Sequence, residues 1–327
     1  MYTAKKKRGP IKKIISKESF STALPILFLL ALIIGFSVGS PVMLNPQNIT
    51  NILRQSAVLL IVSCGATFIV LQGSIDLSVG SIVTLTGIAG AILIRDYQLG
   101  IWALPAAMLG GGAVGALNGF LFAYGKVPSF LVTLGALFAL DGLALLLSDG
   151  QAVQLMDRSY ARVASGSLIG TLPNIALSSF IVFIVTSMIG KYTKFGRYMY
   201  AIGGGERVAR LSGIPVDRFK LYAFIFSGIL CGLAGALMMA RLQAGSPRMG
   251  EGLVLDSIAA VVISGTALPG GVGGVHRTIL GVFIIGILSN GLNVNAVDAN
   301  TQIILKGVIM VAAVFLTIDR TKINNLK

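Results

Sequence analysis

The sequence predicts an all-α polytopic membrane protein of about ten transmembrane helices. Of its 327 residues, 55% are hydrophobic and 12% are charged, whereas a soluble domain usually carries roughly a quarter charged residues. Several long stretches contain no Asp, Glu, Lys or Arg, and a helix needs about 20 mostly apolar residues to cross a bilayer. The alternation typical of membrane barrel strands is absent. The spans are therefore expected to be helices.

The spans are placed by the apolar runs between charged, Gly-rich or Pro-rich breaks. They fall near residues 25–41, 52–71, 77–95, 101–123, 129–148, 175–190, 221–240, 255–267, 278–293 and 303–318. Residues 1–24 are expected to form a basic cytoplasmic tail, residues 25–319 a single transmembrane domain, and residues 320–327 a second cytoplasmic tail.

The positive charges set the predicted orientation. Most of the 26 basic residues lie in the N-terminal tail, in the segment 191–220 and in short loops on the same side of the predicted membrane. The positive-inside rule then places both termini in the cytoplasm. The formal net charge of +14 is explained by this topology and by attraction to anionic lipid, so it does not indicate nucleic-acid binding.

A short motif occurs twice and predicts an inverted internal repeat. An Asp followed by small residues opens spans three and eight, and an Asn-Gly pair closes spans four and nine; the residues are Asp76 and Ser78, Asp256 and Ser257, and Asn118 and Asn290. On the predicted topology Asp76 lies at the cytoplasmic side and Asp256 at the outer side. Spans 2–5 and 7–10 therefore run in opposite senses, as in many transporters, whose pathways form between the repeats.

The repeated motif has two interpretations. Asp76 with Ser78 and Ser81, and Asp256 with Ser257, could line a translocation pathway together with Asn118 and Asn290. Alternatively each Asp only caps the start of a helix, which explains both the carboxylate and the small residues after it. The sequence leaves both interpretations open.

Two further features lie inside predicted spans. Asp141 is an intramembrane charge in the fifth span. Because an unpaired charge in a membrane is costly, it is expected to face a dimer interface or a wet cavity, with Lys306 and Arg54 as candidate partners. The spacings Gly111-Gly115-Gly119 and Gly228-Gly232 predict close helix contacts within the chain.

A short helix is predicted inside the long basic segment 191–220. Three glycines form a turn, Glu206 begins the helix, and Gly213 and Pro215 end it. Val208 and Leu211 share one face beside two arginines, so the helix could dock another protein; a solvated loop is the alternative. The predicted coupling residues are Gly203, Gly204, Gly205, Glu206, Arg207, Val208, Arg210, Leu211 and Gly213.

Five motifs in fixed order carry a family resemblance. They occupy residues 73–81, 127–135, 193–204, 209–214 and 255–266. With these motifs the chain resembles, over nearly its whole length, the permease subunits of ATP-binding cassette (ABC) importers of the ribose, xylose and galactose type, also called the branched-chain amino acid and sugar permease superfamily.

The resemblance implies a fold, a location and partners. The implied fold is the ten-helix architecture of the larger class of ABC importer permeases, in the bacterial inner membrane. The implied partners are cytoplasmic ATPase subunits that dock at residues 203–213, an extracytoplasmic sugar-binding protein, and a second permease copy or paralogue. The implied cargo is a monosaccharide, either a pentose or a hexose, or a related polyol or sugar-like signal.

No cofactor is expected in this chain, and ATP and Mg²⁺ are expected on the partner ATPase. Neither Gly-Lys pair in the sequence, at 125–126 or 190–191, continues as a phosphate-binding loop. With a single histidine, His276, the sequence indicates no catalytic triad and no metal site. Two other classes of function stay open: an ion-coupled secondary carrier that uses Asp76 or Asp141, and a membrane scaffold without transport.

Overall fold

The computed structural model describes residues 17–155 and 157–317. Residues 1–16 of the predicted N-terminal tail and the whole predicted C-terminal tail, 320–327, lie outside the described residues. Residues 17–24, which were predicted as tail, already belong to the first helix, because this helix begins at Lys17.

A helix lies at each of the ten predicted span positions. These helices are α1 (Lys17–Gly39), α2 (Pro46–Leu71), α3 (Val79–Tyr97), α4 (Ala103–Ala123), α5 (Ser129–Ser148), α7 (Asn174–Tyr192), α10 (Val216–Leu242), α11 (Leu253–Ile263), α12 (Val275–Val294) and α13 (Ala299–Thr317). Within the described residues, 7 helices are long and apolar enough to cross a membrane. The all-α polytopic membrane fold is therefore confirmed.

Shorter elements connect the long helices. They are η2 (Pro41–Leu44), η3 (Gly100–Trp102), β1 (Val153–Gln154), α6 (Arg158–Ser165), α8 (Lys194–Gly204), α9 (Glu206–Leu211) and β2 (Ala244–Gly245). The two short strands pair antiparallel.

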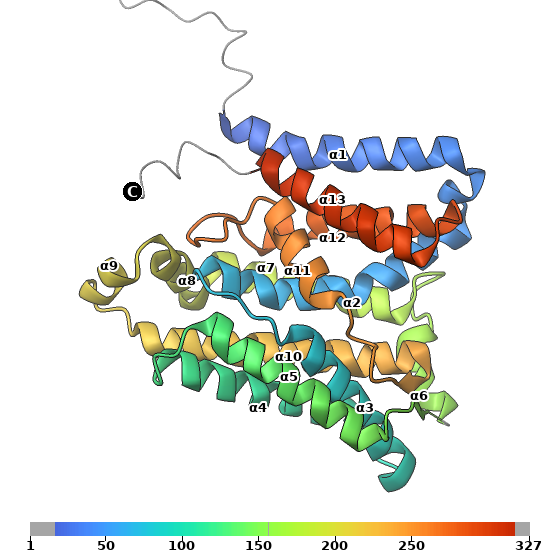
Figure 1. Ribbon diagram of the computed structural model, residues 1–327, viewed down its shortest axis with the longest axis horizontal. Helices are drawn as coiled ribbons and strands as arrows, with labels where there is room; N and C mark the ends of the chain where they lie inside the picture. The colour runs from blue at the N-terminus through green and yellow to red at the C-terminus, as the bar shows by residue number, and fades with distance from the viewer. Residues whose placement is uncertain (1–16, 156, 318–327) are drawn as a thin grey trace, which may run out of the picture.

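The long helices run side by side across the view of Figure 1. Helices α1 and α13 lie along one side of the bundle, and α4 and α5 lie along the other. Helices α8 and α9 lie together at one end of the bundle, which we call the α9 end, and α6 lies at the opposite end.

Helices α2 and α10 form the centre of the bundle. Every residue from Ser56 to Leu71 is buried, and α10 contacts α2, α3 and α4. A helix that is apolar all round belongs in an interior. By contrast, α5 exposes large side chains such as Phe138 (68%) and Leu146 (76%), as expected for a surface that faces lipid or another subunit.

Glycines bring α4 and α10 into backbone contact. A Cβ atom at Gly111 would collide with the carbonyl of Gly228, and one at Gly232 would collide with the carbonyl of Ala107. Gly115 packs in the same way against the carbonyl of Phe224. The prediction that these glycines make close helix contacts within the chain is confirmed.

The two halves of the chain run in opposite directions. Arg241, at the end of α10, donates a hydrogen bond to the carbonyl of Arg54, near the start of α2, at 3.3 Å. In the repeat, α2 corresponds to α10, α3 to α11 and α4 to α12. Equivalent contacts occur in both halves: α3 packs on α4 as α11 packs on α12. Across the halves, α10 packs on α3 and α4 as α2 packs on α11 and α12. This arrangement matches the inverted repeat that the sequence predicts.

The eighth helix is short, as its predicted span at 255–267 indicates, but it begins and ends earlier than predicted. Helix α11 has 11 residues, so at about 1.5 Å per residue it spans about 16 Å, roughly half of a bilayer core of about 30 Å. It begins at Leu253 after Gly252, two residues before the predicted start. The repeat is therefore unequal, because its counterpart α3 has 19 residues.

The α4–α10 contact predicts a large effect for one substitution. In Gly228→Leu the new side chain meets the α4 backbone, which cannot move aside as a side chain would. We expect the free energy of unfolding to fall by about 3 kcal/mol. A thiol-reactive dye can follow thermal unfolding in detergent, because the free cysteines Cys64 and Cys231 are both buried.

The matched control is Gly35→Leu on α1, since a Cβ at Gly35 has no atom within 4 Å. This variant should unfold at the temperature of the unmodified protein. Equal melting temperatures for Gly228→Leu and Gly35→Leu would show that stability does not depend on the close approach of α4 and α10 at Gly228.

Candidate functional site

Helix α9 presents an apolar tip at the α9 end of the bundle. Val208 is 68% exposed and Leu211 is 81% exposed, whereas Ala209 is buried. Gly213 follows in the left-handed region at φ 80°, and the amide of Ile214 bonds back to the carbonyl of Ala209 at 3.1 Å, as at many helix ends. The predicted helix is therefore present, and Figure 1 shows it standing out from the bundle.

Arg210 is directed toward its own chain. Its guanidinium donates to both carboxylate oxygens of Asp217, at 2.9 and 3.0 Å, and to Glu206 at 3.1 Å. The sequence placed Arg207 and Arg210 together beside a docking face. Both are exposed on α9, and of these two arginines only Arg210 forms ion pairs among the described residues. Arg210 therefore stays a predicted coupling residue, with its charge already paired within the chain.

Two lysines join Glu206, Arg210 and Asp217 to form a charge cluster between α9 and the bundle. Lys126, in the loop between α4 and α5, lies 2.8 Å from Asp217, and Lys220 of α10 lies 2.7 Å from Glu206. Burial raises the pKa of Glu206, but the hydrogen bonds and charges of Lys220 and Arg210 outweigh it, so this pKa lies below its ordinary value. Glu206 is therefore ionised at neutral pH.

The sequence indicated only part of this cluster. The spacing of Glu206 and Arg210 favours an ion pair on one helix face. Lys126 comes from a loop far upstream, and no local pattern connects it to α9.

The glycines before α9 do not all form the predicted turn. Gly203 and Gly204 are the last residues of α8, and a Cβ at Gly203 would collide with the carbonyl of Leu71. The amide of Gly271 bonds to the same carbonyl at 2.9 Å. The end of α8 therefore lies against the end of α2 and the loop before α12, and Gly205 alone separates α8 from α9.

Asp76, Ser78, Ser81 and Asn118 do come together. One Asp76 carboxylate oxygen accepts hydrogen bonds from the Ser78 amide (2.8 Å) and hydroxyl (2.6 Å), and the Asn118 amide donates to that hydroxyl at 2.9 Å. Ser81 donates to the Ser78 carbonyl at 2.9 Å. All four residues are buried. Ser78 itself occupies the N-cap position of α3, so Asp76 stabilises the turn before this helix.

The second copy of the motif is arranged differently. Helix α11 begins at Leu253, which leaves Asp256 inside the helix, and the Ser257 hydroxyl donates to the Val254 carbonyl at 3.0 Å. The prediction that Asp256 and Ser257 cap this helix is wrong, because the helix starts earlier than the motif. Among the described residues, Asn290 bonds to neither of them and instead exchanges two hydrogen bonds with Asn48 of α2, at 2.8 and 3.0 Å.

Lys306 belongs to Asp256, not to Asp141. The Lys306 ammonium lies 4.0 Å from the Asp256 carboxylate, across the contact of α11 and α13. Arg54 lies beside Arg241, and Asp141 forms no ion pair within 17–155 and 157–317. The expected pairing of Asp141 with Lys306 or Arg54 is therefore wrong.

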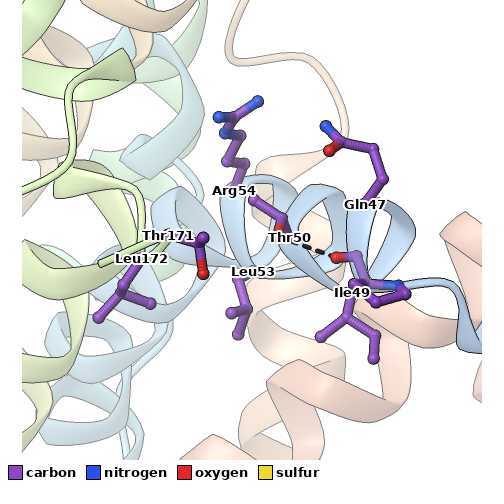
Figure 2. A pocket seen from close by; sticks show the side chains of 8 residues that line it. Gln47, Ile49, Thr50, Leu53, Arg54, Thr171 and Leu172 are labelled. Atoms are coloured by element: carbon purple, nitrogen blue, oxygen red, sulfur yellow. Dashed lines mark hydrogen bonds between the residues drawn. The ribbon is translucent and has the colours of Figure 1, made fainter. Parts of the chain in front are cut away.

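A cleft that the sequence did not indicate lies at the opposite end from α9. It has a volume of about 510 Å³ and lies between the first turns of α2 and residues 171–172. Figure 2 shows the polar side chains of Gln47, Thr50, Arg54 and Thr171 around it. Within the described chain no three metal-ligating side chains gather.

The Asp76 cluster predicts a stability effect. Asp76→Ala removes the acceptor of two buried donors on Ser78, so we expect the free energy of unfolding to fall by about 1–3 kcal/mol. Asp76→Asn keeps an acceptor oxygen and should lose less. The same thiol-dye unfolding assay tests both variants, with the exposed Glu251 as the site of a control, Glu251→Ala. Unchanged unfolding of Asp76→Ala would contradict the structural role.

Comparisons with known proteins identify the family. The family model described as "Branched-chain amino acid transport system / permease component" matches residues 48–314. The ribose import permease protein RbsC of Bacillus subtilis (strain 168) is 39% identical over 300 residues, which cover 91% of this chain and 92% of that protein.

Two relatives from Escherichia coli (strain K12) extend this similarity. Its RbsC is 37% identical over 292 residues, covering 88% of this chain and 91% of the relative. Its xylose transport system permease protein XylH is 34% identical, covering 84% and 85%. No solved structure matched significantly. Because the family model covers most of the chain and these relatives align over nearly their whole length, the chain belongs to the branched-chain amino acid transport system permease component family.

Proposed function

We propose that this chain is the membrane permease subunit of an ATP-driven importer that carries a monosaccharide, most specifically a pentose, into the cytoplasm. Relatives that align over most of the chain are named for ribose import and xylose transport. The structural observation that carries the proposal is α9, whose exposed Val208 and Leu211 form an apolar tip at one end of a membrane bundle. Such a tip is suited to a groove on another protein.

The partner at the α9 end is a cytoplasmic ATPase. The basic residues Lys191, Lys194 and Arg197 lie in or beside α8, and the positive-inside rule assigns their end of the bundle to the cytoplasm. The same orientation puts both termini inside the cell. ATP and Mg²⁺ are bound by the ATPase, and this chain supplies Val208, Leu211 and Arg207 to the contact.

The opposite end receives the sugar from an extracytoplasmic binding protein. The cleft beside Arg54 and Thr171 lies at this end and offers polar side chains to a docked protein. A second permease copy, or a paralogue, completes the pathway, for which the exposed apolar face of α5 is a suitable contact.

The alternative, an ion-coupled carrier, requires Asp76 or Asp141 to bind a proton or Na⁺. No observation favours it: Asp76 is buried and already accepts two hydrogen bonds from Ser78, an arrangement sufficient to explain its carboxylate.

Uptake of labelled ribose, xylose and galactose into proteoliposomes tests the proposal. The vesicles contain this chain with its proposed partners, a cytoplasmic ATPase and a sugar-binding protein. We expect pentose uptake that requires ATP and both partners, and that persists in Asp76→Asn if this variant folds. Uptake by this chain alone under a proton or Na⁺ gradient, lost in Asp76→Asn or Asp141→Asn, would establish the secondary carrier instead.

Docking at α9 makes a separate prediction. The double variant Val208→Asp and Leu211→Asp places two carboxylates on the apolar tip, so we expect at least a tenfold loss of ATPase retained on the purified permease. Leu168→Asp is the matched control, because Leu168 is also exposed (80%) but lies in the loop after α6, at the other end. Equal retention of the ATPase by both variants would reject α9 as the docking site.

A further inference from the structure

Helix α9 cannot hold its own position. It has six residues, of which only Ala209 is buried, and isolated helices shorter than about 12–15 residues are marginal in water. Its large apolar side chains, Val208 and Leu211, face away from the bundle. Something other than apolar packing must fix this helix against the membrane domain.

One connection runs through Arg210. Its guanidinium holds Asp217 of α10 with two hydrogen bonds, at 2.9 and 3.0 Å, and such paired contacts fix direction as well as distance. Asp217 also binds Lys126 at 2.8 Å. The Lys126 ammonium donates in turn to the carbonyl of Ala123, the last residue of α4, at 2.6 Å.

A second connection runs through Glu206 to the same helix. Glu206 accepts a hydrogen bond from Lys220 at 2.7 Å, and the side chain of Lys220 is only 10% exposed. The Lys220 ammonium lies 4.6 Å from the ring centre of Phe122 on α4, a cation–π contact. Glu206 and Arg210 also pair with each other, so the two connections are joined at α9.

Both connections therefore lead from α9 through α10 to the end of α4. Isolated exposed ion pairs contribute little to stability. Here, however, five charged side chains share partners, Arg210 binds Asp217 through two hydrogen bonds, and Lys220 is buried. Helices α4 and α10 are themselves in backbone contact at Gly111 and Gly228, so they form a stiff pair.

We propose that Lys126, Glu206, Arg210, Asp217 and Lys220 form a coupling clamp, which makes α9 move as one body with α10 and α4. The clamp transmits displacement of α9 by the docked ATPase to this central helix pair. Its transmitting role rests on the proposed function, whereas its mechanical role in holding α9 does not. The clamp residues are positioning residues and do not touch the sugar.

Hydrogen exchange of the full chain in detergent, without the ATPase, tests the mechanical role. We expect amide exchange of residues 206–213 to become at least tenfold faster in Asp217→Asn and in Lys220→Met. Lys220→Arg keeps the charge and the position over Phe122, and should exchange within threefold of the unmodified protein. The control Arg218→Gln removes an exposed neighbouring charge and should change nothing. Unchanged exchange in both Asp217→Asn and Lys220→Met would overturn the clamp.

The ratio of ATP hydrolysed to sugar imported tests the transmitting role in the reconstituted importer. We expect this ratio to rise at least fivefold in Asp217→Asn, with the ATPase still retained, because α9 then moves without α10. For Arg210→Lys, which keeps the charge but loses the two parallel hydrogen bonds to Asp217, we expect a ratio between those of the unmodified protein and Asp217→Asn. Faster exchange with an unchanged ratio would overturn transmission through the clamp.

The two possible failures are distinguishable. If the unmodified importer shows no ATP-dependent uptake, the proposed function fails, and the exchange experiment still decides whether the clamp holds α9. If uptake depends on ATP but the clamp variants behave like Arg218→Gln in both measurements, only the clamp fails.

Discussion

The backbone contact between α4 and α10 is the interaction on which the rest of the bundle depends. Gly111, Gly115, Gly228 and Gly232 let the two helices meet without intervening side chains. Lipid chains are as apolar as Leu or Val, so close packing must supply the association that the hydrophobic effect supplies in water. Around this pair α2 and α3 complete the centre, and the charge cluster between α9 and the bundle is attached to its end.

Two sets of polar side chains inside the bundle are matched to one another. Asp76, Ser78 and Asn118 form one buried cluster, and Asn48 and Asn290 form a reciprocal amide pair. Unsatisfied polar groups are costly in a bilayer, so this pairing fixes which helices lie together. It gives these residues a structural role that needs no contact with a transported molecule.

Helix α9 separates two tasks by the direction of its side chains. Val208 and Leu211 face outward, where they can bind another protein. Glu206 and Arg210 face the bundle, where they form ion pairs with Lys220 and Asp217 of α10, and Asp217 also pairs with Lys126 of the α4–α5 loop. A short helix with one buried residue can thus have a defined position. The chemistry of its outer face is independent of the charges that orient it.

The sequence by itself determined the helical membrane fold, the approximate position of all ten helices, the glycine contacts and the existence of α9. These features follow from local composition, because bilayer thickness sets the length of an apolar run and glycine spacing sets helix approach. Only the tertiary structure decided that Arg210 and Lys126 both meet Asp217, that Lys306 meets Asp256, and that Asp256 lies inside α11 instead of at its start. The sequence of a uniformly apolar helix does not indicate which neighbouring helix it will pack against. The partners of its few charged residues are therefore set only when the bundle assembles.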